Sequence, residues 1–141
     1  LQKDIQDVVF LNLHFKDGKM GQLQVSWLDP HKIRRLTIVG SEKMAVFDDT
    51  LPWPQKLVLY PHRVDWVEGK LPIADKAEAV PVELEEVEPL RSECEHFLQC
   101  VATRRPPLTD GESGLAVLRV LEAAQSSLEK AGMPQRLGNG S

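Results

Sequence analysis

The sequence predicts an α+β fold in which a mainly antiparallel sheet comes first and two helices follow at the C-terminal end. Three observations carry this prediction. Apolar and polar residues alternate in short runs from Val8 to Leu84, which is the period of half-buried strands. After Glu88-Pro89 the period changes to 3.6 residues. Strands that precede helices, instead of alternating with them, are typical of α+β domains.

Four strands are expected in the first third of the chain. In residues 8–15 every odd position is apolar, so one face of this strand is committed to a core. Asp17-Gly18 is expected to form the hairpin turn, because both residue types tolerate positive φ. The return strand ends near Trp27, and two further strands are expected over residues 32–39 and 44–47.

Further strands are expected over residues 57–60 and 64–67, which gives a sheet of about six strands, and residues 80–84 alternate once more as a last strand before the helices. Pro52 and Pro54 impose a loop on the chain that leads into them. Residues 71–79 lack a clear period, so we expect them to cross the surface as irregular chain.

Both helices are expected to be amphipathic. The first runs from Pro89 to about Arg104 and ends before Pro106-Pro107. Its apolar stripe consists of Leu90, Cys94, Phe97, Leu98 and Val101. The second is expected to begin at a capping box formed by Thr109 and Glu112 and to end at Gly132. Its stripe consists of Leu115, Leu118, Leu121, Ala124 and Leu128.

Two helices on one face leave the other face of a six-stranded sheet open. In the first strand that open face carries Val8 and Phe10. Exposed apolar faces of this kind are typical of contacts with another domain or subunit, so a dimer interface at Val8 and Phe10 is the hypothesis. The alternative is that residues 71–79 and the loop around Trp53 cover this face.

Composition predicts a single globular domain over residues 1–134, with a flexible tail at 135–141. Of the 141 residues, 42% are hydrophobic and 27% are charged, which is close to the average for soluble domains. A net charge of −4 argues against nucleic acid as a partner. The sequence has no apolar run of membrane-spanning length and no signal peptide, so a cytoplasmic protein is expected.

Cysteines and histidines predict neither a disulfide nor a metal site. Cys94 and Cys100 lie six residues apart on one expected helix, on different sides, so they cannot pair with each other. They are expected to be reduced thiols, with Cys94 in the core. The four histidines are scattered and have no ligand spacing.

A set of short motifs, ordered along the chain, carries a family resemblance over about residues 4–131. These motifs are Asp17-Gly18, Ser26-Trp27 with Pro30, Lys32 and Arg34-Arg35, Val39-Gly40-Ser41 with Asp48-Asp49, Glu88-Pro89-Leu90, Phe97-Leu98, Arg105-Pro106-Pro107, residues 109–114 and residues 120–124. Together they resemble the C-terminal domain of the Gfo/Idh/MocA (glucose-fructose oxidoreductase and inositol dehydrogenase) family.

The resemblance implies part of an NAD(P)-dependent oxidoreductase (a dehydrogenase) of sugars, nucleotide-linked sugars or cyclitols. Family members have an N-terminal Rossmann domain and a C-terminal sheet domain that closes the substrate pocket and makes subunit contacts. This chain lacks the Gly-x-Gly-x-x-Gly motif of a Rossmann domain and the family's Glu-Lys-Pro lysine. We therefore expect it to bind neither NAD nor NADP and to be inactive alone, with the Rossmann domain preceding Leu1.

Two functions follow as hypotheses. The first is the substrate-side and oligomerisation domain of such an oxidoreductase, with NAD or NADP held by the Rossmann domain of the full-length protein and a sugar-type substrate as the other partner. The second is a stand-alone binding or oligomerisation module without redox activity. Neither hypothesis assigns a catalytic residue to this chain.

Five residues are candidates for substrate binding: Trp27, His31, Lys32, Arg34 and Arg35. The three cations suit a carboxylate or phosphate group, and Arg34 and Arg35 are expected to point to opposite faces. Solvated strand charges are the alternative. Trp27 suits stacking on a sugar ring, or core packing if it continues the alternation of its strand. His31 is expected either to donate to substrate or to be an ordinary loop residue.

Overall fold

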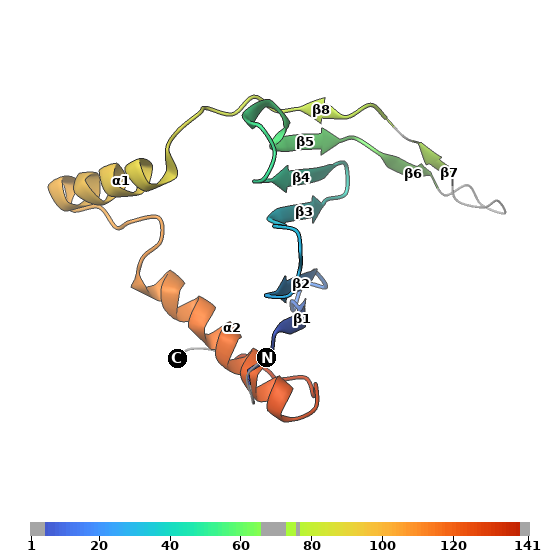
Figure 1. Ribbon diagram of the computed structural model, residues 1–141, viewed down its shortest axis with the longest axis vertical. Helices are drawn as coiled ribbons and strands as arrows, with labels where there is room; N and C mark the ends of the chain where they lie inside the picture. The colour runs from blue at the N-terminus through green and yellow to red at the C-terminus, as the bar shows by residue number, and fades with distance from the viewer. Residues whose placement is uncertain (1–4, 66–72, 76, 139–141) are drawn as a thin grey trace. The chain divides into compact units, whose positions relative to one another are not determined.

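The computed structural model describes residues 5–65, 73–75 and 77–138 (Figure 1). Within these residues the chain is α+β, with two α-helices and antiparallel strands, as the sequence predicts. It divides into two compact units. Unit one consists of Leu1–Trp27 and Glu88–Ser141, and unit two consists of Leu28–Val87.

Unit one begins with an antiparallel hairpin of β1 (Val8–His14) and β2 (Met20–Ser26). Its turn is one residue longer than the predicted Asp17-Gly18 pair. The Phe15 carbonyl accepts a hydrogen bond from Gly18 N at 3.1 Å, and Gly18 alone in this turn has a positive φ, 82°. A three-residue loop that ends in a left-handed glycine matches the twist of the flanking strands.

The two faces of the hairpin differ in polarity, because residues paired across two strands share a face. Val9 pairs with Val25 and Leu11 with Leu23, which makes one face continuously apolar. On the other face Phe10 pairs with Gln24, and 66% of its surface is exposed. Exposure alternates along the whole of β1, which confirms the predicted alternation.

Helix α1 spans Pro89–Thr103 and begins at Glu88, whose carboxylate accepts hydrogen bonds from two backbone amides of the first turn. It ends at Arg104, which adopts a left-handed conformation with a φ of 55°. The predicted position of Cys94 in the core is wrong, because this side chain is exposed. Periodicity identifies the apolar stripe of a helix but not what covers it, and Leu90 and Leu98 of the same stripe are each 65% exposed.

Helix α2 spans Gly111–Glu129, and its N-cap is Asp110 instead of the predicted Thr109. The Asp110 carboxylate accepts a hydrogen bond from Ser113 N at 2.9 Å, as a capping side chain does. At the other end, Gly132 has a φ of 84° and donates its N–H to the Ser127 carbonyl at 2.8 Å. This left-handed stop was predicted correctly.

The less exposed side of α2 is also displaced from the predicted stripe. Leu118 of that stripe is 61% exposed, whereas Val120 and Ala123, which lie outside it, are half-buried, as is Ala124 within it. Gln135, the first residue of the predicted flexible tail, holds to this helix through a side-chain oxygen that accepts hydrogen bonds from Ser126 and Lys130. Within the described ranges, neither helix has the length and continuous hydrophobicity that crossing a membrane requires.

Unit two contains a four-stranded antiparallel sheet in the order β3 (Arg35–Val39), β4 (Met44–Asp48), β5 (Leu57–Tyr60) and β8 (Val80–Pro81), drawn side by side in Figure 1. A 3-10 turn, η1 (Trp53–Gln55), connects β4 to β5 where the two prolines were expected to impose a loop. The central strands β4 and β5 are the least exposed, and every residue of the edge strand β3 is exposed.

In the part of the chain that the structure describes, the strands are divided among three sheets, where one sheet was predicted. β6 (Arg63–Asp65) and β7 (Ile73–Asp75) form a separate two-stranded ladder. The irregular path predicted for residues 71–79 is therefore wrong at 73–75, because three residues are too few to show a period in the sequence. Residues 66 and 67 of the predicted sixth strand lie outside the described part. Two expectations stay predictions: that the helices cover one face of the sheet, and that residues 1–134 form a single domain.

Candidate functional site

A polar cluster surrounds two adjacent carboxylates at the end of β4 in unit two. Asp48 is 6% exposed and lies directly opposite Arg35 in the β3–β4 pair. Its Oδ2 accepts hydrogen bonds from Nε and Nη2 of Arg35 at 3.0 and 2.9 Å. Its Oδ1 accepts from the backbone N–H and the hydroxyl of Thr50. The Thr50 hydrogen bonds, and then Arg35, hold the pKa of Asp48 below its ordinary value.

The neighbouring carboxylate, Asp49, is shared by two cations. Lys56 Nζ lies 2.7 Å from its Oδ1 and Arg34 Nη1 lies 3.5 Å from its Oδ2. The Lys56 side chain is only 14% exposed, and its ammonium group lies 4.6 Å from the ring centroid of Trp53, a cation–π distance. Lys56 is the main cause, and Arg34 the lesser one, of a pKa of Asp49 below its ordinary value.

The β3–β4 register explains why these charges meet. Arg35 is paired with Asp48, and one step further the Asp49 N–H donates to the Arg34 carbonyl at 3.0 Å. Successive residues of a strand point to opposite faces, so the two ion pairs leave the strand pair on opposite sides, as expected for the two arginines. Three cations share two carboxylates, so the cluster keeps one net positive charge in a chain whose net charge is −4.

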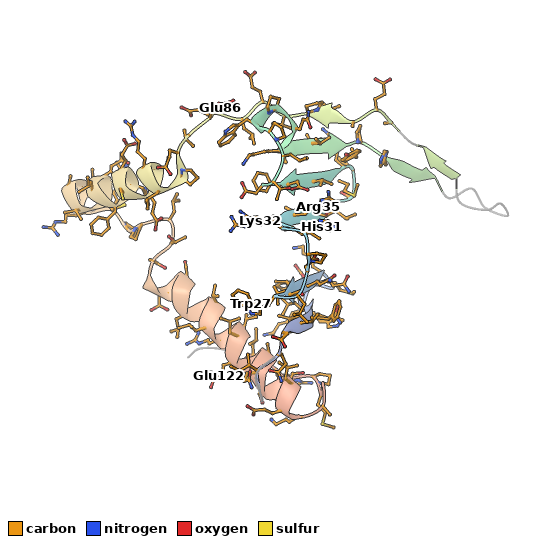
Figure 2. All side chains as sticks on the ribbon, viewed as in Figure 1. Trp27, His31, Lys32, Arg35, Glu86 and Glu122 are labelled. Carbon is orange, nitrogen blue, oxygen red and sulfur yellow. The ribbon has the colours of Figure 1, made fainter. Side chains whose placement is uncertain are left out.

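Two other predicted binding residues lie just before β3 (Figure 2). His31 and Lys32 are both exposed. The His31 N–H donates to the Asp29 carboxylate at 2.9 Å and so closes a local turn. Lys32 forms no ion pair with any residue in the part of the chain that the structure describes. His31, Lys32 and the two arginines thus gather at one end of β3.

Trp27, the fifth candidate, belongs to unit one and is not part of this cluster. This residue is 85% exposed, which disfavours the core-packing interpretation. Its backbone N–H donates to the Asp7 carbonyl at 2.9 Å and prolongs the hairpin by one step. The ring borders a hollow of about 360 Å³ whose other lining residues are Gln6, Asp7, Val9, Val25 and Ser26.

Sequence reasoning missed the carboxylates that hold the arginines. A signal was available, because Arg34-Arg35 and Asp48-Asp49 are equally distant from the turn after Gly40 and so must meet if that turn closes a hairpin. The role of Lys56 had no such signal. It reaches Asp49 only because the turn around Trp53 brings the start of β5 back beside the end of β4.

Neither helix N-terminus is suited to hold a dinucleotide. Glu88 accepts hydrogen bonds from Leu90 N and Arg91 N at 3.2 and 2.6 Å, and Asp110 caps Ser113 N. A carboxylate of this chain therefore caps each helix start, where a pyrophosphate would otherwise bind, and its negative charge would repel that group. Within the described ranges, no three His, Cys, Asp or Glu side chains gather as metal ligands do.

Comparison with known proteins agrees with the resemblance seen in the sequence. The model of the oxidoreductase family C-terminal alpha/beta domain (GFO_IDH_MocA_C) matches residues 2–134, which is almost the whole chain. Neither the curated proteins nor the solved structures gave a match. The chain therefore belongs to the Gfo/Idh/MocA oxidoreductase family and represents its C-terminal α/β domain.

Proposed function

We propose that this chain is the substrate-side and subunit-contact domain of an NAD(P)-dependent oxidoreductase that acts on a sugar, nucleotide-linked sugar or cyclitol. The family match over residues 2–134 is the observation that carries the proposal. NAD or NADP is supplied by an N-terminal Rossmann domain. This chain, which is the substrate-side domain, is not catalytic alone. The carboxylates of Glu88 and Asp110, which cap the two helices, support the proposal that the cofactor is held by the other domain.

The cationic end of β3 supports recognition of an anionic group on the substrate. Asp48 engages Nε and Nη2 of Arg35 and thereby fixes the guanidinium plane, which leaves Nη1 for a further acceptor. Lys32 lies three residues away and has no partner among the described residues. A phosphate or carboxylate that approaches this end meets the oriented guanidinium of Arg35 and the exposed ammonium group of Lys32. Arg34 is partly neutralised by Asp49.

Trp27 in unit one supports a separate contact with an uncharged ring. An exposed indole beside Val9 and Val25 offers an apolar platform, and Gln6 and Asp7 add polar groups at the border of the same hollow. Sugars present apolar ring faces and polar edges, and a surface that combines both kinds of group suits them. His31 completes the set of proposed substrate contacts.

Val8 and Phe10 are the proposed subunit contact. They lie on the same face of β1, and they are 40% and 66% exposed. A two-fold dimer uses the same surface of both copies, which is the commonest arrangement for soluble oligomers. We place the protein in the cytoplasm, which the two unpaired cysteines support.

The decisive experiment is to read the genomic DNA immediately upstream of the Leu1 codon and to express the complete reading frame. An in-frame Rossmann domain and NAD(P)-dependent oxidation of a sugar, a nucleotide-linked sugar or a cyclitol are expected. In that enzyme, Lys32→Gln and Arg35→Gln should raise KM for an anionic substrate more than they lower kcat. A start codon directly before Leu1 would favour the stand-alone binding or oligomerisation module instead.

A further inference from the structure

Strand β3 is an open edge of the four-stranded sheet in unit two. In the described part of the chain it is the last strand on its side of the order β3-β4-β5-β8, and all five of its residues are exposed. The opposite edge is protected, because β8 has only two residues and one of them, Pro81, has no backbone N–H. β3 carries neither proline nor lysine, the residues that commonly keep an edge strand from pairing. Among the described strands, this sheet is therefore open on the β3 side only.

The β3–β4 register shows which backbone groups β3 offers at this edge. The Gly40 N–H donates to the Lys43 carbonyl at one end of the pair, and the Asp49 N–H donates to the Arg34 carbonyl at the other. Hydrogen-bonded positions alternate along an antiparallel pair, so the even-numbered residues of β3 are the ones bonded to β4. The odd-numbered residues direct their N–H and C=O groups away from β4, toward the open edge. They are Arg35, Thr37 and Val39.

The side chains of β3 are complementary to those of a second, antiparallel β3. A two-fold axis at Thr37 is the arrangement that pairs all five residues of the strand. On one face Leu36 then lies opposite Ile38 of the second copy, and in the single chain these two residues are 57% and 58% exposed. On the other face Arg35 lies opposite Val39 of the second copy. The pairing thus brings apolar side chains together and no like charges, and the Arg35 guanidinium already has a carboxylate partner in its own chain.

We infer that β3 pairs with β3 of a second copy of this chain, antiparallel and across a two-fold axis at Thr37. The outward backbone groups of the two strands bond to each other, and the two four-stranded sheets become one. Because the β8 edge is protected, this sheet closes as a pair instead of extending further. The surface is separate from the proposed contact at Val8 and Phe10. A five-residue edge buries less area than a stable interface needs, so the pairing requires high protein concentration and is absent in dilute solution.

Disulfide trapping in concentrated protein tests the register. Leu36 and Ile38 of the second copy would form a non-hydrogen-bonded pair with Cα atoms about 4.5 Å apart, within the reach of a disulfide. Two copies of Leu36, or two of Ile38, would be offset along the strands and lie beyond that reach. A mixture of Leu36→Cys and Ile38→Cys chains should therefore form the mixed disulfide at least about tenfold faster than either variant forms a disulfide with itself, because pairing raises the effective concentration of the two thiols. Mass spectrometry separates these products from disulfides of Cys94 and Cys100.

Two proline variants separate pairing from folding. The Thr37 N–H faces the open edge, so Thr37→Pro, added to both cysteine variants, should remove the preference for the mixed disulfide and leave the urea midpoint nearly unchanged. The Ile38 N–H is bonded to β4, so Ile38→Pro should disrupt the sheet.

Three outcomes overturn the inference. The first is a mixed disulfide that forms no faster than the self-disulfides. The second is a Thr37→Pro chain that unfolds, because that result would show that another segment of the same chain occupies the edge. The third is loss of the preference in folded chains that also carry Phe10→Glu, since the pairing would then depend on the proposed contact in unit one. We expect the preference to persist in those chains.

Discussion

The same substitution, glycine to alanine, should have opposite effects at two positions of α2 and its end. Gly114 lies inside the helix, whereas Gly132 follows it with a φ of 84°. An added Cβ would meet no atom within 4 Å at either position. Steric fit is thereby excluded as a cause, and the backbone conformation alone decides the sign of each effect.

The two magnitudes follow from backbone preferences. Gly114→Ala should stabilise the folded chain by about 0.5–1 kcal/mol, since alanine loses less conformational entropy in a helix. Gly132→Ala should destabilise it by about 1–2 kcal/mol, because an L-residue with a side chain is strained in the left-handed region. Relief of that strain would break the hydrogen bond from Gly132 N to the Ser127 carbonyl.

Urea unfolding, followed by far-UV circular dichroism, measures both effects. The two urea midpoints should move in opposite directions, with an unchanged slope of unfolding free energy against urea concentration. In a thermal scan, a change of 1 kcal/mol corresponds to a shift in Tm of a few degrees, about 2–4 °C for domains slightly longer than this chain. Gly138→Ala, where the added Cβ also meets open space, is the matched control and should change little. Ala131, which precedes Gly132, also has a positive φ, 55°, so the test concerns Gly132 alone. A neutral Gly132→Ala protein would show that this residue is not held in the left-handed region, and the reasoning would fail.

Four further predictions concern association, capping, pH and cofactor. Phe10→Glu should convert a self-associating chain into a folded monomer in sedimentation experiments, whereas the control Gln99→Glu, at an exposed helix position, should leave association unchanged. A monomeric unmodified chain, or an unfolded Phe10→Glu protein, would contradict the proposed interface. Glu88→Ala removes the hydrogen bonds to Leu90 N and Arg91 N and should lower the free energy of unfolding by about 0.5–2 kcal/mol, and Glu86→Ala, outside the helix, should have little effect. Asp48 and Asp49 have a pKa below the ordinary value in the folded chain, so their contribution to stability is complete above the ordinary carboxyl range and is lost as pH falls below about 4. Urea unfolding at a series of pH values should show a smaller loss of stability at acid pH in Asp48→Asn than in the unmodified chain. An equal dependence of the unfolding free energy on pH in the two proteins would contradict the ion-pair cluster. Calorimetry with NAD or NADP should detect no binding at micromolar concentration. A measurable heat of binding would be inconsistent with helix starts that are capped by the carboxylates of Glu88 and Asp110.

Features that depend on a few neighbouring residues were determined by the sequence alone. The change of period at Glu88-Pro89 located both helices, and the stop at Gly132 was correct because a left-handed position favours glycine. The alternation of exposure along β1 was predicted correctly for the same local reason. The ordered motifs also identified the family, since each motif is a local pattern.

Tertiary structure alone decided the contacts between residues distant in sequence. The sequence left Arg35 as either a substrate contact or a solvated strand charge, but the β3–β4 register pairs it with Asp48, the most buried residue of the described part. Lys56 reaches Asp49 through the turn at Trp53. Periodicity placed Cys94 and Leu118 inside, and both are exposed, because a 3.6-residue period states which side of a helix is apolar and leaves open what packs against it.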